Sequence, residues 1–243
     1  MNVWSHKVFV LGCALLFPAA FSVMAQTRSS SEAEIWQAAV RRRAESFTMA
    51  PGELPYEQYQ LESDGNVAHR ETGRMSLAYG ADGRAAISII WAKRDDVDFT
   101  AERGRRLEKQ ASRRNEFLSL TTPFDPDVQD RLERGPGTRV LAEGAALWQY
   151  EFRLPMNEDR SIVGTARVWE DGRPCDVRYT LDPLPWFLDI IEMHLVFDTE
   201  AELPLFHTVD YKYEASFLFW VWRGGGQASF DAWTRISSPP RLN

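Results

Sequence analysis

The sequence predicts an α+β protein whose main element is a strongly curved antiparallel β half-barrel of about 11 strands. From residue 56 onward, apolar side chains recur with a period of two, which is typical of strands that bury one face. Turn signals interrupt this pattern at intervals and predict hairpin connections. These signals are Asp64-Gly65, Asp82-Gly83, Asp171-Gly172 and Gly224-Gly225-Gly226. An N-terminal helix and two inserted helices are predicted to cover the concave face.

The N-terminal helix is predicted to begin after Ser31 and to end near Phe47. Ser31 is a favoured N-cap residue, and Glu34 stands three positions later, which is the reciprocal capping pattern. Apolar side chains then repeat at helical spacing and form one face of the helix. They are Trp36, Val40, Ala44 and Phe47.

The strands are expected to follow one another in an antiparallel meander, because short turns separate most of them. Their predicted ranges are 56–63, 71–79, 84–93, 138–142, 145–154, 161–169, 174–181, 188–199, 204–213, 216–223 and 227–236. The triple glycine is predicted to be the last hairpin of this series.

Two helices are predicted to interrupt the meander between Thr100 and Gly135. Thr100 can cap a helix that continues to about Leu118, and Asp125-Pro126 supplies an N-cap and a first-turn proline for a shorter one. Residues 26–236 then form a single domain. The tail at 237–243 has no apolar pattern and is predicted to be disordered.

Residues 1–25 are predicted to be a signal peptide. The segment has Lys7, an apolar run over 8–20, and small residues leading to a cleavage site after Ala25. Pro18 interrupts the run, which disfavours a membrane anchor. Cys13 follows Lys7 too closely for a lipoprotein site. A periplasmic location is therefore expected.

The chain is acidic, with 28 basic and 35 acidic side chains and a formal net charge of -7. This balance argues against a general nucleic-acid-binding protein. After the predicted cleavage Cys175 is the only cysteine, so neither an intramolecular disulfide nor a zinc site of several cysteines is expected.

The faces of two late strands are unusually apolar. In 188–197 one face reads Ile191, Met193, Leu195 and Phe197, and in 217–222 both faces are apolar. Such strands are either buried on both faces or face an apolar cavity. The nine tryptophans of the chain fit the same two alternatives, a filled core or a lined cavity.

The second half of the chain resembles the LolA/LolB-like superfamily over residues 140–236. The resemblance depends on Tyr150-Glu151-Phe152, Gly164-Thr165-Ala166-Arg167-Val168-Trp169, Asp171-Gly172-Arg173-Pro174, Pro183-Leu184-Pro185 and Leu203-Pro204. It implies an open half-barrel with a concave face that is closed by helices and binds acyl chains or other lipid. No cysteine directly follows the predicted signal, which disfavours a membrane-anchored receptor.

The resemblance implies a periplasmic, non-enzymatic carrier for a hydrophobic ligand or a lipidated protein. Such a carrier is expected to be a monomer, with transient contact to a membrane or an envelope protein and no bound nucleic acid. The alternatives are an envelope interaction module without a ligand and an exported hydrolase. Strand position and alternation place eight side chains near the cavity. They are Trp91, Trp148, Phe152, Trp186, Met193, Phe197, Phe219 and Trp233.

Basic side chains crowd the first inserted helix, where Glu102 and Arg106 are spaced for an ion pair. Either this is a solvated helix face, or Arg106, Arg113 and Arg114 form a basic rim that meets a lipid head group or an acidic partner.

The sequence contains no recognisable catalytic motif, and no cofactor is expected. His194 and His207 lie on strands that could be neighbours, so a zinc site there is one interpretation and two ordinary strand histidines the other. For the alternative of an exported hydrolase no nucleophile, base and orienting group can be recognised, and mutation of Cys175, His194 and His207 would test it.

Overall fold

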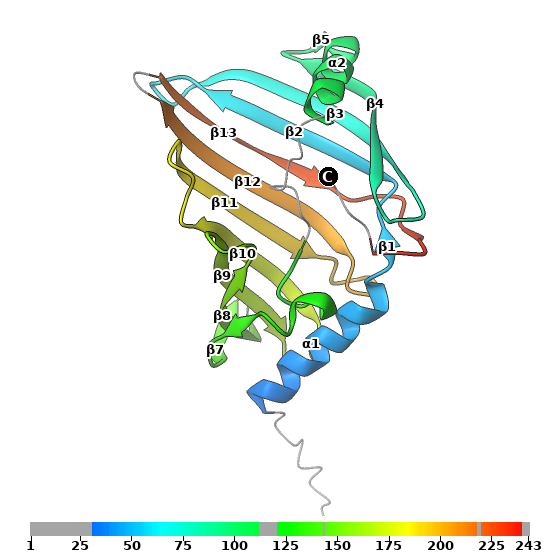
Figure 1. Ribbon diagram of the computed structural model, residues 1–243, viewed down its shortest axis with the longest axis vertical. Helices are drawn as coiled ribbons and strands as arrows, with labels where there is room; N and C mark the ends of the chain where they lie inside the picture. The colour runs from blue at the N-terminus through cyan, green and yellow to red at the C-terminus, as the bar shows by residue number, and fades with distance from the viewer. Residues whose placement is uncertain (1–30, 112–120, 143, 218–219, 240–243) are drawn as a thin grey trace, which may run out of the picture.

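The computed structural model describes residues 31–111, 121–142, 144–217 and 220–239. It confirms the sheet-dominated α+β class (Figure 1). The helices are α1 (Glu32–Ser46), α2 (Thr100–Ala111) and the 3-10 turn η2 (Pro126–Val128). The strands are β1 (Met49–Ala50), β2 (Glu53–Leu61), β3 (Val67–Tyr79), β4 (Ala85–Arg94), β5 (Val97–Asp98), β6 (Glu133–Arg134), β7 (Thr138–Ala142), β8 (Ala145–Pro155), β9 (Ser161–Trp169), β10 (Pro174–Asp182), β11 (Leu188–Phe197), β12 (Phe206–Phe217), β13 (Trp220–Ser229) and β14 (Thr234–Arg235).

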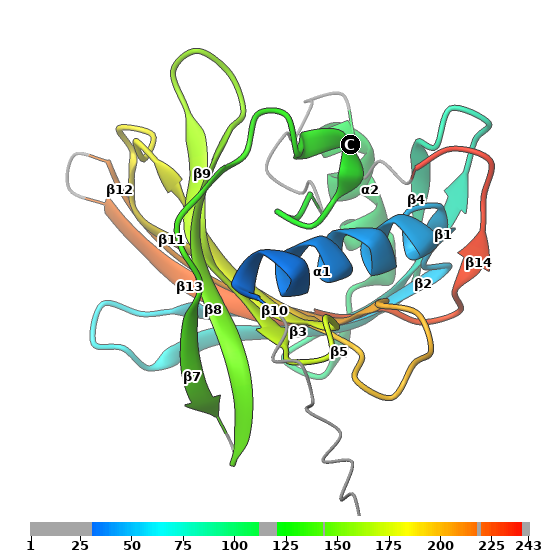
Figure 2. The ribbon, with the colours of Figure 1, turned by 90° about the horizontal axis from the view of Figure 1, so that it is seen from below.

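In the described ranges, 12 strands form one antiparallel sheet, and β1 pairs separately with β14. The order in the sheet is β5-β4-β3-β2-β13-β12-β11-β10-β9-β8-β6, with β7 also paired to β8. The sheet is open, because the strands at its two ends, β5 and β6, do not pair with each other. Both are only two residues long. Figure 2 shows that it curves around α1.

The predicted N-terminal helix is present with its cap. The Ser31 hydroxyl accepts from the Glu34 amide, and the Glu34 carboxylate accepts from the Ser31 amide. Trp36 is buried, with its ring 5.0 Å from Phe124 and 4.9 Å from Tyr150. Since Tyr150 belongs to β8, this contact defines the face of the sheet that α1 covers, called here the inner face.

The hydrophobic core lies between α1, the segment around η2 and the inner face of β8 to β12. Its larger members are Ile35, Trp36, Phe124, Tyr150, Phe152, Val177, Leu195, Phe197 and Phe206. Arg43 of α1 is buried among them and donates to Asp125 at 2.7 Å and to Ser46 at 3.1 Å. Asp125 also accepts from the Thr122 amide, so one carboxylate connects α1 to this segment.

The predicted hairpin at the triple glycine is wrong, since Gly224, Gly225 and Gly226 lie inside β13. Each glycine is directly opposite a tyrosine on a neighbouring strand, and a Cβ atom there would come within 2.7–2.8 Å of that tyrosine's hydroxyl. The three pairs are Tyr213 with Gly224, Tyr59 with Gly225 and Tyr211 with Gly226. The glycines therefore make room for aromatic rings within a strand, which is an alternative to forming a turn.

We expect Gly225→Ala to lower the free energy of unfolding by about 1–3 kcal/mol, as in an overpacked interior. The new Cβ atom would lie 2.6 Å from the carbonyl oxygen of Tyr211 and 2.8 Å from the Tyr59 hydroxyl. Gly104→Ala in α2 is the control. Outside the neighbouring turns of the helix, no atom of the described residues lies within 4 Å of its Cβ position, so alanine should stabilise the helix by up to about 1 kcal/mol. Urea unfolding of both variants checks this, and equal midpoints would contradict it.

The inserted segment differs from the prediction in one helix. Part of the first predicted helix is present as α2, and residues 112–118 lie outside the described residues. The second is only a three-residue 3-10 turn, η2. Strands β1, β5 and β6 were not predicted, because strands of two residues are too short to show a period.

Both predicted ends lie largely outside the described residues. The signal peptide and its cleavage site after Ala25 fall entirely outside them. Of the predicted disordered tail, only 237–239 are described, and there the Ser238 hydroxyl donates to the carbonyl of Ala81 at 2.9 Å. None of the helices in the described ranges is long and apolar enough to cross a membrane.

Candidate binding site

A single row of cross-strand neighbours runs along the inner face from the core to a charged cluster. Each member is directly opposite the next one on the neighbouring strand, and such residues share a face. The row, called here the inner row, is Phe152, Gly164, Tyr179, Met193, Tyr211, Gly226, Gln58, Glu71 and Arg94. It thus changes from apolar to charged along its length.

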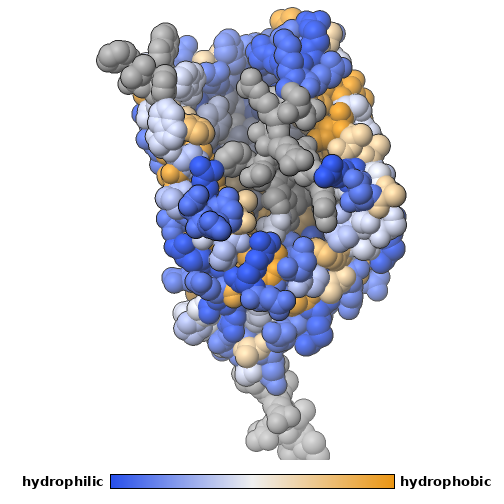
Figure 3. Space-filling view, in the orientation of Figure 1, coloured by the Kyte–Doolittle hydropathy of each residue, from blue (hydrophilic) through white to orange (hydrophobic). Residues whose placement is uncertain are grey.

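The apolar half of the inner row is only partly covered. Phe152 belongs to the buried core, whereas Tyr179 and Met193 are partly buried and pack against its edge. Burial raises the pKa of Tyr179 to about 12, so its hydroxyl stays neutral at physiological pH. On the visible side of the molecule, small hydrophobic areas interrupt a largely hydrophilic surface (Figure 3).

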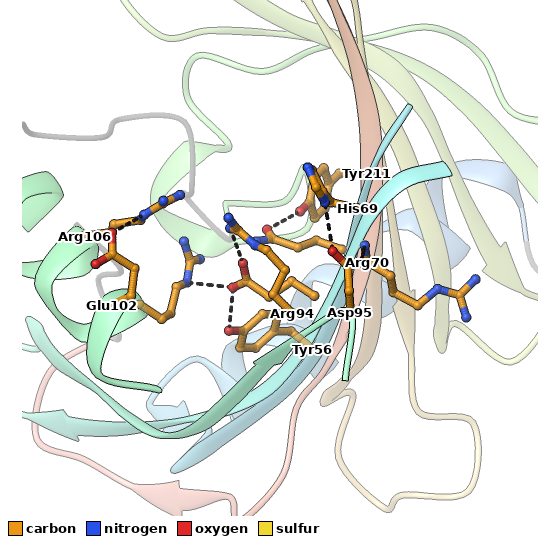
Figure 4. Close-up of polar contacts among 11 residues, drawn as sticks. Tyr56, His69, Arg70, Arg94, Asp95, Glu102, Arg106 and Tyr211 are labelled. Atoms are coloured by element: carbon orange, nitrogen blue, oxygen red, sulfur yellow. Dashed lines mark hydrogen bonds and ion pairs between the residues drawn. The ribbon is translucent and has the colours of Figure 1, made fainter. Parts of the chain in front are cut away.

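The charged half of the row centres on Glu71, whose residue is only 3% exposed. Its Oε2 accepts from Arg94 at 2.8 Å, and its Oε1 accepts from the Tyr56 hydroxyl at 2.9 Å. Arg103 reaches in from α2, with its Nε 3.2 Å from Oε1. Figure 4 shows Tyr56 and Arg94 pointing toward the same place. These four residues are called the Glu71 cluster.

Electrostatics keep the Glu71 carboxylate ionised. Burial alone would raise its pKa, but the hydrogen bond from Arg94 and the charge of Arg103 outweigh burial and hold the pKa below the usual 4.5. The Arg94 guanidinium also lies 3.9 Å from the centre of the Phe99 ring, which fixes its position. The cluster therefore contains two permanent positive charges and one negative charge.

A small hollow of about 120 Å³ adjoins the Glu71 cluster on the inner face. It is called the inner hollow. Its lining is polar, and consists of Gln58, Tyr59, Gln60, His69, Glu71, Arg94, Tyr211 and Tyr213. The Tyr211 hydroxyl donates to Oε1 of Gln58 at 3.1 Å.

The opposite, outer face has a larger groove, with a volume of about 730 Å³. Side chains one position away from the inner row form a second, polar row across it. This outer row is Glu151, Thr165, Arg178, His194, Asp210, Gln227, Glu57, Thr72 and Lys93. The groove is lined by side chains of both signs, with Arg178 and Lys212 positive and Glu57, Glu192 and Asp210 negative, so it is a polar surface of mixed charge.

Asp176 lies on the outer face, beside this row, and is only 2% exposed. It accepts from Arg167 through both carboxylate oxygens, once at 2.7 Å, and lies 2.8 Å from Nε2 of His194. Burial opposes its ionisation, but the hydrogen bonds from Arg167 and His194 outweigh burial and lower its pKa to about 2. Nδ1 of His194 faces Asp210 at 3.6 Å, so carboxylates flank the ring on both sides.

Five of the eight predicted cavity residues belong to the hydrophobic core or pack against it. Phe152 and Phe197 are core residues, and Trp148, Met193 and Trp233 are partly buried and pack against the core. The structure does not place the other three against the core. Trp91 is 41% exposed and Trp186 is 79% exposed, while Phe219 lies outside the described residues.

Trp91 and Trp186 lie away from the core for two different reasons. Ala92 is buried and is directly opposite Gly73, which lies on the inner face two residues after Glu71. Trp91 precedes Ala92 on the strand, so its side chain points to the outer face. A bulge between Arg74 and Met75 shifts this register. Trp186 lies in the connection between β10 and β11, outside either strand.

The predicted basic rim is described at one residue. Arg106 pairs with Glu102 at 3.0 Å on the exposed side of α2, as its spacing predicted (Figure 4). Arg113 and Arg114 lie outside the described residues. The arginines that point to the inner face, Arg94 and Arg103, were not singled out. The sequence does contain a signal for Glu71. It lies on the same face of its strand as Gly73, Met75 and Leu77, so its carboxylate is a charged group on an otherwise apolar face.

The zinc interpretation of His194 and His207 is wrong. His194 is directly opposite Asp210. His207 is three residues from Asp210 on the same strand, about 10 Å away, at a bulge in the pairing of β12 with β11. Within the described ranges, no three His, Cys, Asp or Glu side chains are grouped to hold a metal ion.

Comparison of the chain with protein-family models, curated proteins and solved structures finds no match. The LolA/LolB-like resemblance therefore stays a prediction.

Proposed function

We propose that this chain is a non-enzymatic binding or carrier protein that takes an apolar ligand on the inner face of a LolA/LolB-like half-barrel. In this proposal α1, α2 and the segment around η2 cover the concave side of the curved sheet. The cargo is a lipid or the acyl chain of a lipidated protein, and the carrier works as a monomer in the periplasm.

The observation that carries the proposal is the partly covered apolar half of the inner row. Tyr179 and Met193 pack on the core by one side and remain partly exposed on the other. Covering such surface with hydrocarbon contributes about 0.8 kcal/mol for each buried methylene before the costs of association. Because the sheet is not closed into a barrel, a ligand would not have to separate paired strands to reach this face.

The first test is the content of the purified protein. We expect extraction with organic solvent followed by mass spectrometry to release lipid from protein prepared from the periplasm, and the stripped protein to bind a fluorescent fatty acid. No copurifying lipid together with no fluorescence response would contradict the proposal.

A charge in the middle of the inner row should weaken ligand binding. Met193→Glu would place a carboxylate between Tyr179 and Tyr211, where burying it beneath hydrocarbon costs several kcal/mol. We expect at least a tenfold weaker affinity for the fluorescent fatty acid. Ile90→Glu is the matched control, because Ile90 is already exposed to solvent, and it should bind as the wild type does. Equal affinities of all three proteins would place the ligand elsewhere.

The outer groove supports a second candidate, an envelope interaction module that carries no lipid. Its charges of both signs, with Arg178, Asp210 and Lys212 among them, suit a polar partner. In that case Met193→Glu would have no effect on partner binding, whereas Arg178→Glu would weaken it.

A further inference from the structure

Among the described residues, the inner hollow presents more hydrogen-bond donors than acceptors that take them. Both oxygens of Glu71 are occupied, by Arg94 on one side and by Tyr56 and Arg103 on the other. The amide oxygen of Gln58 is occupied by Tyr211, which leaves its NH2 group as a donor. The guanidinium of Arg94 has five N–H donors, of which one oxygen of Glu71 takes one.

The charge of the Glu71 cluster is also unbalanced. Two guanidinium groups, with side chains 28% and 16% exposed, face one carboxylate that is almost completely buried. In addition, the buried Nε of Arg103 has no hydrogen-bond acceptor in suitable geometry among the described residues, although it lies close enough to Glu71 for an ion pair. A partly buried excess positive charge is stabilised by an anion.

The position of the hollow connects it to the apolar surface. Along the inner row, four inter-strand steps separate Tyr179 on β10 from Gln58 on β2, which is roughly 19 Å at about 4.8 Å for each step. Met193 and Tyr211 lie between them. One extended molecule can therefore contact the apolar residues at one end and the donors at the other.

We infer that the inner hollow binds the anionic group, a carboxylate or phosphate, of an amphipathic ligand whose hydrocarbon extends past Tyr211 to Met193, and on to Tyr179 where the chain is longer than dodecyl. The inference rests on the proposed function and specifies the ligand class. The volume of about 120 Å³ equals roughly four water molecules at about 30 Å³ each, so it fits the charged group and not a large head group.

The test compares ligands with the same chain and different ends. Titration calorimetry of the full chain with dodecyl phosphate, dodecanoate and dodecanol should show the two anions binding at least tenfold more tightly than the alcohol, since a hydrogen bond to a charged group contributes about 1.5–3 kcal/mol. Inorganic phosphate alone should bind at least a hundredfold more weakly than dodecyl phosphate.

Two variants locate the charge recognition. Arg94→Gln should reduce the preference for dodecyl phosphate over dodecanol about tenfold while the affinity for dodecanol stays the same. Arg70→Gln is the matched control, because Arg70 precedes Glu71 on β3 but pairs with Glu57 on the outer face. It should keep the wild-type preference. Circular dichroism checks that both variants fold.

Glu71→Gln keeps the inference testable if Arg94→Gln does not fold. Removing the competing carboxylate should raise the affinity for dodecyl phosphate several-fold and leave that for dodecanol unchanged. Equal binding of all three ligands, or equal losses for every ligand in Arg94→Gln, would overturn the inference and leave the proposed function intact. Failure of dodecanol and both anions to bind would overturn the two together. Inorganic phosphate binding as tightly as dodecyl phosphate would indicate a free-anion site and overturn the amphipathic ligand.

Discussion

Asp176→Ala is expected to lower the free energy of unfolding by about 3–5 kcal/mol, the usual cost of removing one partner from a buried ion pair. Asp176 is 2% exposed and is shared by Arg167 of β9 and His194 of β11. Its loss would take the common acceptor away from donors on both flanking strands. Urea unfolding measures the effect. Asp171→Ala is the control, because Asp171 forms only an exposed pair with Arg173, and it should cost less than about 1 kcal/mol.

The same carboxylate predicts a pH dependence. The pKa of Asp176 is lowered to about 2 in the folded protein from its ordinary value of 3.8, so the charged form stabilises the fold fully above about pH 4. This contribution, about 2 kcal/mol, should disappear as the pH falls from about 4 to 2. Asp176→Asn should lack this part of the acid sensitivity. A variant with the wild-type pH profile would contradict the assignment.

Arg43→Met should destabilise the fold by a similar amount, about 3–5 kcal/mol, because it leaves the Asp125 carboxylate buried without its guanidinium. Arg43 also stacks at 4.4 Å over the Phe206 ring, a contact that methionine replaces only in part. The variant should also loosen α1 from the inner face, which hydrogen exchange of the α1 amides would detect.

Arg41→Met is the matched control for Arg43→Met, since it makes the same change two residues earlier in the same helix on the exposed side. Its effect should stay within about 0.5 kcal/mol. If the two variants unfolded at the same urea concentration, the buried pair would not be what holds α1 in place.

The elements with strong local signals were predictable. α1 has its capping box, and the strands from β7 to β11 follow a clear period of two between defined turns. The apolar register of β11 was assigned correctly as a uniform face, because Met193, Leu195 and Phe197 all lie on the inner side. In these segments the local pattern and the tertiary burial agree.

The misses arise where a residue's role depends on a distant strand. The triple glycine has the composition of a turn. It lies within a strand because the tyrosine rings of β2 and β12 occupy the space that side chains at these positions would need. Glu71 and Arg94 come together through the pairing of β3 with β4, although they are 23 residues apart. Trp91 was misplaced because a bulge changes the face of every residue beyond it.

The inner and outer rows also determine where the chain can change length. In nine consecutive strands of the sheet the two rows differ by one position, as in Tyr179 and Arg178 or Met193 and His194. Deleting one residue within such a strand would turn a charged side chain toward the core and a core side chain toward water. Insertions and deletions should therefore be tolerated at the connections and almost nowhere else, so length variation among natural homologues would map the ends of the strands.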